Sequence, residues 1–450
     1  MKFTAMKWSV EKGFVSGLIL LLLGQSTAAP SADPLAGWEN IRSVTMAGGL
    51  RAYWDVNGAP LHQVEALKHG FDPVNLLGDF SDYPGKQQRN IDHYLKKNGP
   101  VATNPWDMPD FFEEIIRQNV GVIANKPDLV ADQKSIFVHD IEFAFEQDIA
   151  KAFADPATKK ASGTSSLAEF REAYLAKWAE WFWLPCKWGK EALPDLPTGL
   201  YGPQPFRRDY WGIAGKDAGQ IDGTHALDAD FWKCIDPHVD FYVASIYVFY
   251  DDPGSIFYIA SNVEENYKRT RSFGNKPVYA YSWLRFHNGN KELAGLELKP
   301  WIADAMAVVP YFYGAKGNVL WGWEPQSKES KLYGNLPVFT DSLGRVADLS
   351  EKIASATPAA DDAIAHVLWK EKAPLLKRLQ VSDDEWIVLA MNPWQNEEAA
   401  CELRISCGTR SFTLELQGRH CDIFHITGDQ VTRLQVDYGK ATEAVNTSVL

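Results

Sequence analysis

Cysteine is scarce in this chain, which has five among its 450 residues. Cys401, Cys407 and Cys421 cluster late, whereas Cys186 and Cys234 lie far from them. These five leave room for one or two disulfides, whose pairing the sequence does not fix. No pair has the close spacing of a zinc ribbon, and there is no His-x-x-x-His. We therefore expect no structural metal.

Basic residues are also in deficit, because 45 Lys and Arg stand against 58 Asp and Glu and give a net charge of −13. A nucleic-acid partner needs a basic face, so this class is disfavoured. The sequence also lacks a Gly-rich phosphate loop between a strand and a helix, a Gly-x-Ser-x-Gly elbow and a His-Glu-x-x-His motif. Phosphoryl transfer, serine hydrolysis and zinc proteolysis are left without support, and we expect no cofactor.

Long hydrophobic runs are missing beyond the N-terminal region. That region has a basic start with Lys2, Lys7 and Lys12, an apolar run over Phe14–Leu23, and small residues over Ser26–Ala29. This pattern is typical of an export signal over residues 1–28, and the run is short for a membrane span. An uncleaved anchor is the alternative. We expect a secreted or periplasmic monomer that has no membrane contact once the signal is removed.

Aromatic residues are abundant, with 17 Trp, 17 Tyr and 23 Phe. Aromatic rings stack on the C–H faces of sugars, so this surplus favours a carbohydrate ligand. An aromatic-rich core is the alternative explanation.

Short apolar runs alternate with longer amphipathic stretches along residues 40–356. We interpret the runs as parallel strands and the stretches as crossover helices, and this favours a TIM-like β/α barrel, seven-stranded, over an open sheet. The expected strands are Leu50–Trp54, Val74–Leu77, Ser135–Glu142, Gly199–Gly202, Phe241–Val248, Pro277–Trp283 and Gly317–Trp323. The expected helices include Asp110–Gln118, Leu167–Trp183, Ile259–Arg271 and Leu298–Val309.

The pattern changes after Ala356. Thr357–Asp362 is typical of a linker, residues 364–428 are predicted to form a small β-sandwich, and residues 429–450 a loose tail. The runs that suggest this sandwich are Ala365–Trp369, Leu375–Val381, Trp386–Asn392, Ala399–Ser406, Ser411–Leu416 and Cys421–Ile426.

The strongest local motif is Ser135–Glu142, a buried strand that ends in two acids. Side chains alternate along a strand, so Asp140 and Glu142 are expected on one side, with backbones roughly 6.6 Å apart, and His139 on the other. Two neighbouring carboxyls do not both ionise cheaply, so one would hold the proton that glycosidic cleavage requires. The alternative is that one acid caps a helix and the other pairs with a base.

Six short motifs in chain order give the sequence a resemblance to the hyaluronidase family, glycoside hydrolase family 56. They are Tyr53-Trp54-Asp55-Val56, Asp140 with Glu142, Gly199–Pro203, Ser245–Tyr247, Pro277–Ser282 and Val319–Gly322. The chain departs from the family in having Ile141 where an aromatic is usual, a β-rich C-terminal part, and no obvious counterparts of the family's disulfide cysteines. It therefore resembles a distant, bacterial-type relative.

The resemblance implies a retaining, substrate-assisted endo-hydrolase of β-linked N-acetylhexosamine glycans, with hyaluronan or chondroitin as first substrates and neutral N-acetylglucosamine polymers left open. Glu142 would be the general acid and then the base, Asp140 would orient the acetamido group, and Tyr247 would bind its oxygen. The implied substrate contacts are Tyr201, Trp321, Tyr53 and Trp323.

Two other functions stay open. Glu142 could pair with Glu324 in a conventional two-carboxylate glycosidase acting on a neutral glycan, and a non-catalytic glycan-binding barrel is the second alternative. Arg207, Arg208 and Asp209 could bind a uronic acid carboxylate or form a surface ion pair.

Overall fold

The structure is a computed structural model, which describes residues 35, 37–57, 60–77, 104–108, 111–124, 135–142, 145–206, 218–323, 333–396 and 399–439. The expected export signal, Arg207, Arg208, Asp209 and Glu324 lie outside the described residues. Trp323 ends a strand, but its side chain is also outside the description.

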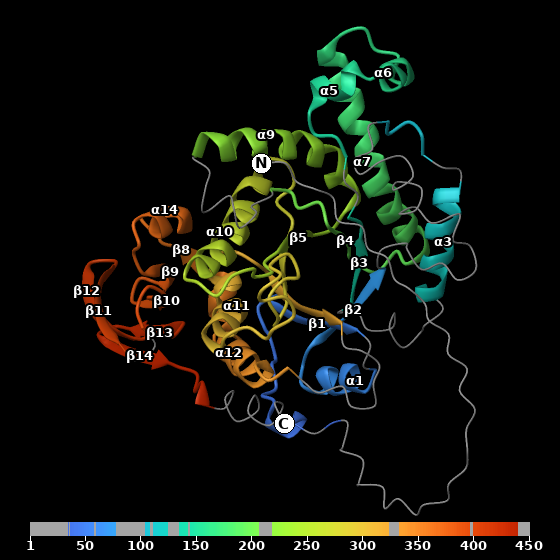
Figure 1. Ribbon diagram of the computed structural model, residues 1–450. Coiled ribbons are helices and arrows are strands. Elements are labelled where there is room, and N and C mark those ends of the chain that lie inside the picture. The colour runs from blue at the N-terminus through green and yellow to red at the C-terminus, as the bar shows by residue number, and fades with distance from the viewer. Residues whose placement is uncertain are drawn as a thin grey trace, which may run out of the picture. The chain divides into compact units, whose positions relative to one another are not determined.

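Seven parallel strands form a barrel-like sheet (Figure 1), which confirms the expected fold class. Its order is β4-β3-β2-β1-β7-β6-β5, and the backbone N–H of Asp240 donates to the Thr198 carbonyl at 2.7 Å where β4 and β5 approach. Each strand falls on a run predicted from the sequence. The strands are β1 (Arg51–Asn57), β2 (Asp72–Leu77), β3 (Ile136–Asp140), β4 (Thr198–Tyr201), β5 (Tyr242–Ser245), β6 (Val278–Ser282) and β7 (Gly317–Trp323).

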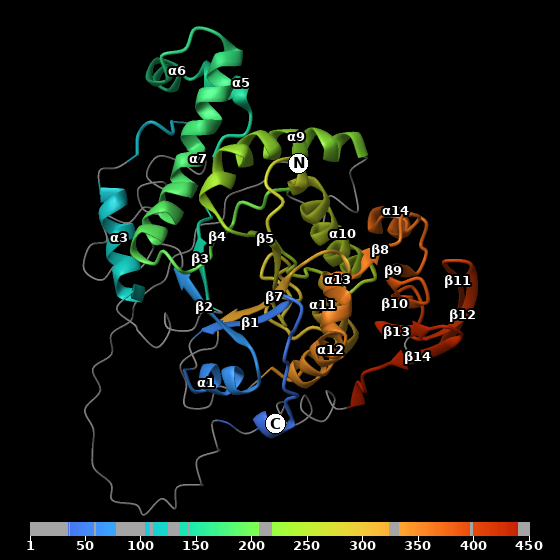
Figure 2. The ribbon, with the colours of Figure 1, turned by 180° about the vertical axis from the view of Figure 1, so that it is seen from behind.

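Helices connect the strands and bury apolar faces against them. The longest, α7 (Leu167–Ala192), starts with a capping box between Ser166 and Glu169 and lies beside α3 (Phe111–Ala124) in both Figure 1 and Figure 2. The others include α1 (Pro60–Lys68), α5 (Ile149–Ala154), α6 (Pro156–Ser162), α9 (Ala218–Ile235), α10 (Gly254–Arg269), α11 (Pro300–Phe312), α12 (Leu336–Asp348) and α13 (Ser350–Ser355). None of the helices in the described part of the chain is long and apolar enough to cross a membrane.

The C-terminal part is built from antiparallel strands, as expected. A five-stranded sheet has the order β14-β13-β10-β9-β8, and a separate hairpin pairs β11 with β12. Apolar side chains of the hairpin and of β10 and β13 share one core. The strands are β8 (Thr357–Pro358), β9 (Leu375–Ser382), β10 (Glu385–Met391), β11 (Ala400–Cys407), β12 (Arg410–Gln417), β13 (Asp422–Thr427) and β14 (Gln430–Leu434).

Two expectations for this part need correction, and the disulfides that the sequence allows do not form. Residues 365–369, read as a strand, form the helix α14 (Ala365–Lys370), which packs against α10. The tail expected to be loose begins with β14, which pairs along β13. All five cysteines are free, so there is no disulfide among them.

A buried polar cluster joins α11 and α12 to the C-terminal strands. Asp304 of α11 is fully buried and forms an ion pair with Arg345 of α12, and it accepts hydrogen bonds from the Ser342 hydroxyl (2.7 Å) and the Tyr438 hydroxyl (2.6 Å). Arg345 also donates to the carbonyl of Cys421 at 2.9 Å. Residues 421–438 are therefore tied to two helices of the barrel.

Candidate active site

Side-chain alternation along β3 separates the two acids from their neighbours. His139 is fully buried with its ring 4.3 Å from that of Phe137, and Ile141 is fully buried in the same apolar cluster as α7. Asp140 is partly exposed and Glu142 is exposed. His139 faces Gly189 of α7, and we expect Asp140 and Glu142 on the opposite side because alternate residues of a strand share a face.

A glycine after β4 allows the backbone that carries Glu142 to lie close to its neighbour. The N–H of Ile141 donates to the Tyr201 carbonyl at 3.1 Å. Gly202 has a φ of +104° and faces the Ile141 carbonyl so closely that a Cβ would collide with it. Only glycine adopts this conformation without strain, so Gly202 allows the backbone that leads into Glu142 to lie against the segment after β4.

Hydroxyl groups from β4 and β5 meet inside the barrel mouth. The Tyr201 hydroxyl lies 3.2 Å from the Ser245 hydroxyl and interacts with that of Tyr247. Burial raises the pKa of Tyr201 and of Tyr247, and the charges of Glu142 and Asp140 raise the pKa of Tyr201 further. Both tyrosines are thus protonated donors, and Asp140 stands opposite Tyr201 in the register of β3 and β4.

Aromatic rings form a wall around Tyr247. Its ring centroid lies 5.6 Å from Trp321 of β7 and 5.9 Å from Trp283, and these two indoles meet edge-on at 5.0 Å. His287 stacks on Tyr247 at 6.0 Å. The structure therefore brings together five residues expected at the site, which are Asp140, Glu142, Tyr201, Tyr247 and Trp321.

Asp55 is a site residue that we missed from the sequence. It is 2% exposed in β1, and its Oδ2 accepts a hydrogen bond from the Tyr281 hydroxyl at 3.2 Å. Burial raises the pKa of Tyr281, and the charges of Asp55 and Asp140 raise it further, which places both acids near this hydroxyl. The sequence signal that could have identified Asp55 is an acid inside an otherwise apolar strand, Tyr53-Trp54-Asp55-Val56.

Tyr53 is not brought to the mouth. It is 2% exposed, and its ring lies 5.3 Å from that of Tyr279. Gly317, at the start of β7, faces both rings. Tyr53 therefore fills the barrel at the level where the strands begin, and we drop it as a substrate contact.

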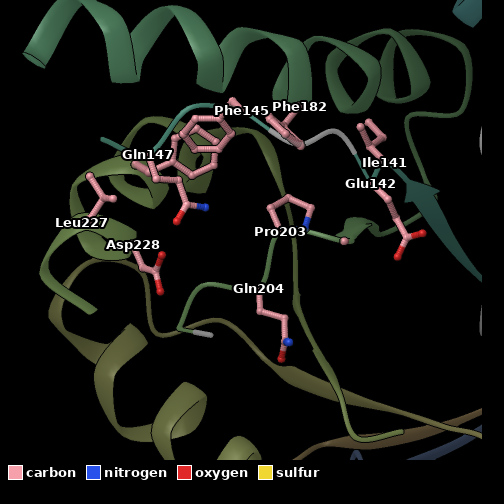
Figure 3. A pocket seen from close by; sticks show the side chains of 11 residues that line it. Ile141, Glu142, Phe145, Gln147, Phe182, Pro203, Gln204, Leu227 and Asp228 are labelled. Atoms are coloured by element: carbon pink, nitrogen blue, oxygen red, sulfur yellow. The ribbon is translucent and has the colours of Figure 1, made fainter. Parts of the chain in front are cut away.

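A pocket opens beside Glu142, on the side of the helices (Figure 3). It has a volume of about 290 Å³ and lies between the chain segments that follow β3 and β4 and the helices α7 and α9. Glu142 therefore borders both the barrel mouth and this pocket. The lining residues are Ile141, Glu142, Phe145, Gln147, Phe182, Gly202, Pro203, Gln204, Leu227, Asp228 and Phe231.

Within the described ranges, no group of three or more His, Cys, Asp or Glu side chains is arranged to hold a metal ion. The chemistry available at the mouth is that of carboxyl groups, phenolic hydroxyls and indole rings.

The chain matches no family model and no curated protein. Among solved structures it is similar to bee venom hyaluronidase in complex with a hyaluronic acid tetramer, with 13% identity and a TM-score of 0.39 over 61% of this chain and 90% of that one. It is also similar to a monoclinic crystal structure of bee venom hyaluronidase, with 14% identity and a TM-score of 0.41 over 68% of this chain and 99% of that one. A modular endo-β-1,4-mannanase from Cellulomonas fimi is similar with 9% identity and a TM-score of 0.33 over 84% of this chain and 80% of that one. These scores are all below 0.5, so the assignment of a function depends on the side chains of the site.

Proposed function

We propose that this protein is a glycoside hydrolase that cleaves β-linked N-acetylhexosamine glycans with retention of configuration, with the substrate's acetamido group as nucleophile. The observation that carries this proposal is the grouping at the barrel mouth. Two carboxyl groups, Asp140 and Glu142, lie near a layer of buried, protonated tyrosine hydroxyls and beside the Trp321 wall.

Each side chain has a role in the proposed first step. The acetamido oxygen attacks the anomeric carbon while Glu142 gives its proton to the departing glycosidic oxygen. Asp140 orients the acetamido N–H, and the Tyr247 hydroxyl donates to the acetamido oxygen. Trp321 packs against the acetamido methyl group, and the Tyr201 hydroxyl holds that of Tyr247 in place.

In the second step the Glu142 carboxylate removes a proton from water, which attacks the same carbon from the side that the leaving sugar vacated. The acetamido group is restored and the new hydroxyl has the original β configuration. Two inversions at one carbon therefore give net retention, and the step needs no group beyond those at the mouth.

The test compares wild type with Glu142→Gln and Asp140→Asn on hyaluronan, chondroitin and N-acetylglucosamine oligomers. We expect Glu142→Gln to lower kcat by about 10²–10⁴, the range of general acid–base catalysis, because glutamine cannot deliver a proton. Asp140→Asn should lower kcat less, since an amide still fills the position. Glu172→Gln, an exposed glutamate on α7, is the matched control. Unaltered turnover in Glu142→Gln would refute the proposal.

De-N-acetylated oligomers separate the two-carboxylate alternative, which uses Glu142 and Glu324, from the proposed mechanism. The proposed mechanism requires the acetamido oxygen, so removal of the acetyl group should abolish cleavage. Cleavage at the full rate would favour the two-carboxylate enzyme. Binding of oligomers with no new reducing ends would favour the non-catalytic glycan-binding barrel.

A further inference from the structure

The barrel has a seam between β4 and β5. These two strands, both of which the structure describes, stand at the two ends of the strand order and share no ladder of backbone hydrogen bonds. Where the strands begin, the Asp240 side chain accepts the Thr198 N–H at 2.8 Å. At the mouth, Tyr201 ends β4, Ser245 ends β5, and Tyr247 follows two residues later. The hydroxyl layer of the candidate active site therefore spans a join whose register is not fixed by backbone pairing.

Ser245 has both of its backbone groups turned towards this seam. The N–H of the next residue, Ile246, donates to the Tyr281 carbonyl of β6 at 2.9 Å. Neighbouring residues of a strand present their backbone groups to opposite sides, so the N–H and the carbonyl of Ser245 point away from β6. Because buried backbone groups need hydrogen-bond partners, Ser245 requires partners that are not part of a strand.

Side chains supply these partners. Gln204 lies in the segment after β4, and its Oε1 accepts the Ser245 N–H at 3.1 Å. In Figure 3 the Gln204 amide points away from the rings of Phe145 and Phe182. The Ser245 carbonyl accepts hydrogen bonds from two side chains of α10, the Asn262 amide and the Tyr258 hydroxyl, the latter at 3.0 Å. The end of β5 is therefore held from both the β4 side and the helix side.

A second asparagine of α10 extends these contacts to the segment that carries Gln204. Asn266 lies one turn after Asn262, and its side chain accepts the Phe206 N–H at 3.0 Å and donates to the Phe206 carbonyl at 2.9 Å. The Asn266 amide also donates to the Asn262 Oδ1 at 3.3 Å. Both asparagines are fully buried, so these bonds are shielded from water. Gln204, Asn262 and Asn266 thus form one hydrogen-bonded group, which we call the seam network.

The seam network sets where Tyr247 lies relative to Tyr201. The ring centroids of these two tyrosines are 6.0 Å apart, and the Ser245 hydroxyl lies 3.2 Å from that of Tyr201. A hydroxyl that stabilises a transition state has to be held within about 0.5 Å of its productive position. In the proposed function, on which this inference rests, Tyr247 donates to the acetamido oxygen. A shift of β5 along the seam would misplace that donor without removing any group that touches the substrate.

We propose that Gln204, Asn262 and Asn266 are positioning residues of the reaction, which act through Tyr247 by fixing the end of β5 against the segment after β4. Tyr247 acts in the transition state, so loss of the seam network lowers kcat and leaves KM nearly unchanged.

The main experiment is a double-mutant cycle on kcat between Gln204→Met and Tyr247→Phe. The substrate is whichever of the hyaluronan, chondroitin and N-acetylglucosamine oligomers wild type cleaves fastest. Methionine keeps the length of the side chain but removes the acceptor of the Ser245 N–H, and the variant should fold because Gln204 is only half-buried.

We expect Gln204→Met to lower kcat at least ten-fold in the wild-type background and at most two-fold in the Tyr247→Phe background, where no hydroxyl is left to misplace. KM should stay within three-fold of wild type. A merely structural role of Gln204 would lower kcat by the same factor in both backgrounds, and that result overturns the inference. Gln380→Met, at a half-buried glutamine of β9, is the matched control and should leave kcat within two-fold of wild type.

A second cycle tests the helix side of the seam network. Asn262→Ala should show the same dependence on the Tyr247 hydroxyl. Asn318→Ala is its control, because it removes a buried amide of β7 that donates to the Met306 carbonyl at 2.8 Å, and it should change kcat by the same factor in both backgrounds. If Asn262→Ala does not fold, the cycle with Gln204→Met decides alone.

Hydrogen exchange tests the seam network without reference to activity. In Gln204→Met, at least one amide of the peptide over residues 241–249 should exchange ten-fold faster than in wild type or Gln380→Met, because the Ser245 N–H has lost its acceptor. Unchanged exchange in this peptide would mean that Gln204 does not hold β5, and the inference would be wrong.

Failure of the inference is distinguishable from failure of the proposed function. If cleavage depends on Glu142 and Tyr247 but Gln204→Met has equal effects in both backgrounds, only the positioning role is wrong. If exchange rises in Gln204→Met but no cleavage depends on Glu142, the proposed function is wrong and the positioning role is overturned with it.

Discussion

Replacement of Asp304 by asparagine should destabilise the protein more than any surface substitution. The carboxylate is fully buried, pairs with Arg345, which is only 4% exposed, and accepts bonds from Ser342, Tyr438 and the Cys421 N–H. Asparagine removes the charge and directs an NH₂ group at groups that are themselves donors. Breaking a buried ion pair from one side costs about 3–5 kcal/mol, because the other charge stays buried without compensation.

The assay is urea unfolding at pH 7, followed by tryptophan fluorescence and far-UV circular dichroism. We expect Asp304→Asn to lose about 3–5 kcal/mol of unfolding free energy. Asp195→Asn, at an exposed position, should lose less than about 0.5 kcal/mol. In a double-mutant cycle with Arg345→Met, the combined loss should be smaller than the sum of the single losses, because the double variant no longer buries an unpaired guanidinium.

Two results would refute this reasoning. One is a loss below about 1 kcal/mol for Asp304→Asn, which is the size of an ordinary neutral hydrogen bond and would mean that the buried charge is compensated elsewhere. The other is strict additivity in the cycle, which would mean that Asp304 and Arg345 do not depend on each other.

Three further predictions concern the barrel. Gly202→Ala should lower the unfolding free energy by at least about 1 kcal/mol, because Gly202 has a positive φ and faces the Ile141 carbonyl. Thermal unfolding and kcat measure the effect, and unchanged stability would contradict the assigned backbone. Burial lowers the pKa of His139 to about 3. As the pH falls, the unfolded chain therefore takes up a proton on this side chain before the folded protein does. The contribution of neutral His139 to the unfolding free energy is complete above the unfolded pKa of about 6.5 and falls as pH drops from there towards 3, by up to about 1.4 kcal/mol per pH unit. His139→Leu should flatten this slope in urea titrations between pH 4 and 7, and an identical slope in the variant would show that other groups cause it. Tyr247→Phe should lower kcat by about 10²–10³, the effect of losing a transition-state donor, whereas Tyr267→Phe on α10 should not, and equal kcat in both variants would remove Tyr247 from the mechanism.

The barrel could be predicted from the sequence because each of its strands is a short apolar run between amphipathic helices. The same rule failed for Ala365–Trp369, since a run of five apolar or aromatic residues fits a short helix as well as a strand. It also missed β14, whose Gln-Val-Thr-Arg-Leu sequence is polar because it pairs with β13 only and lies at the edge of its sheet.

The site could be predicted in part. Parity predicted that His139 of β3 faces away from Asp140, because the period of a strand is two, and His139 does face α7. Depth within the barrel was not predictable in this way. Tyr53 and Asp55 have the same parity in β1, yet Asp55 lies beside Tyr281 whereas Tyr53 lies one layer deeper beside Tyr279. The pocket was also beyond the sequence, because Phe145, Phe182 and Phe231 meet only through the packing of α7 and α9.

The attachment of Asp304 and Arg345 to Cys421, Leu434 and Tyr438 has a consequence for the order in which the protein matures. A chain leaves the ribosome from its N-terminus, so α11 and α12 emerge long before the groups that hydrogen-bond and cover their buried ion pair. Until those last residues arrive, Asp304 and Arg345 have only each other and Ser342 in a site that is still open to water. The newly made barrel therefore reaches its full stability only after residues 421–438 have been synthesised and have packed against it.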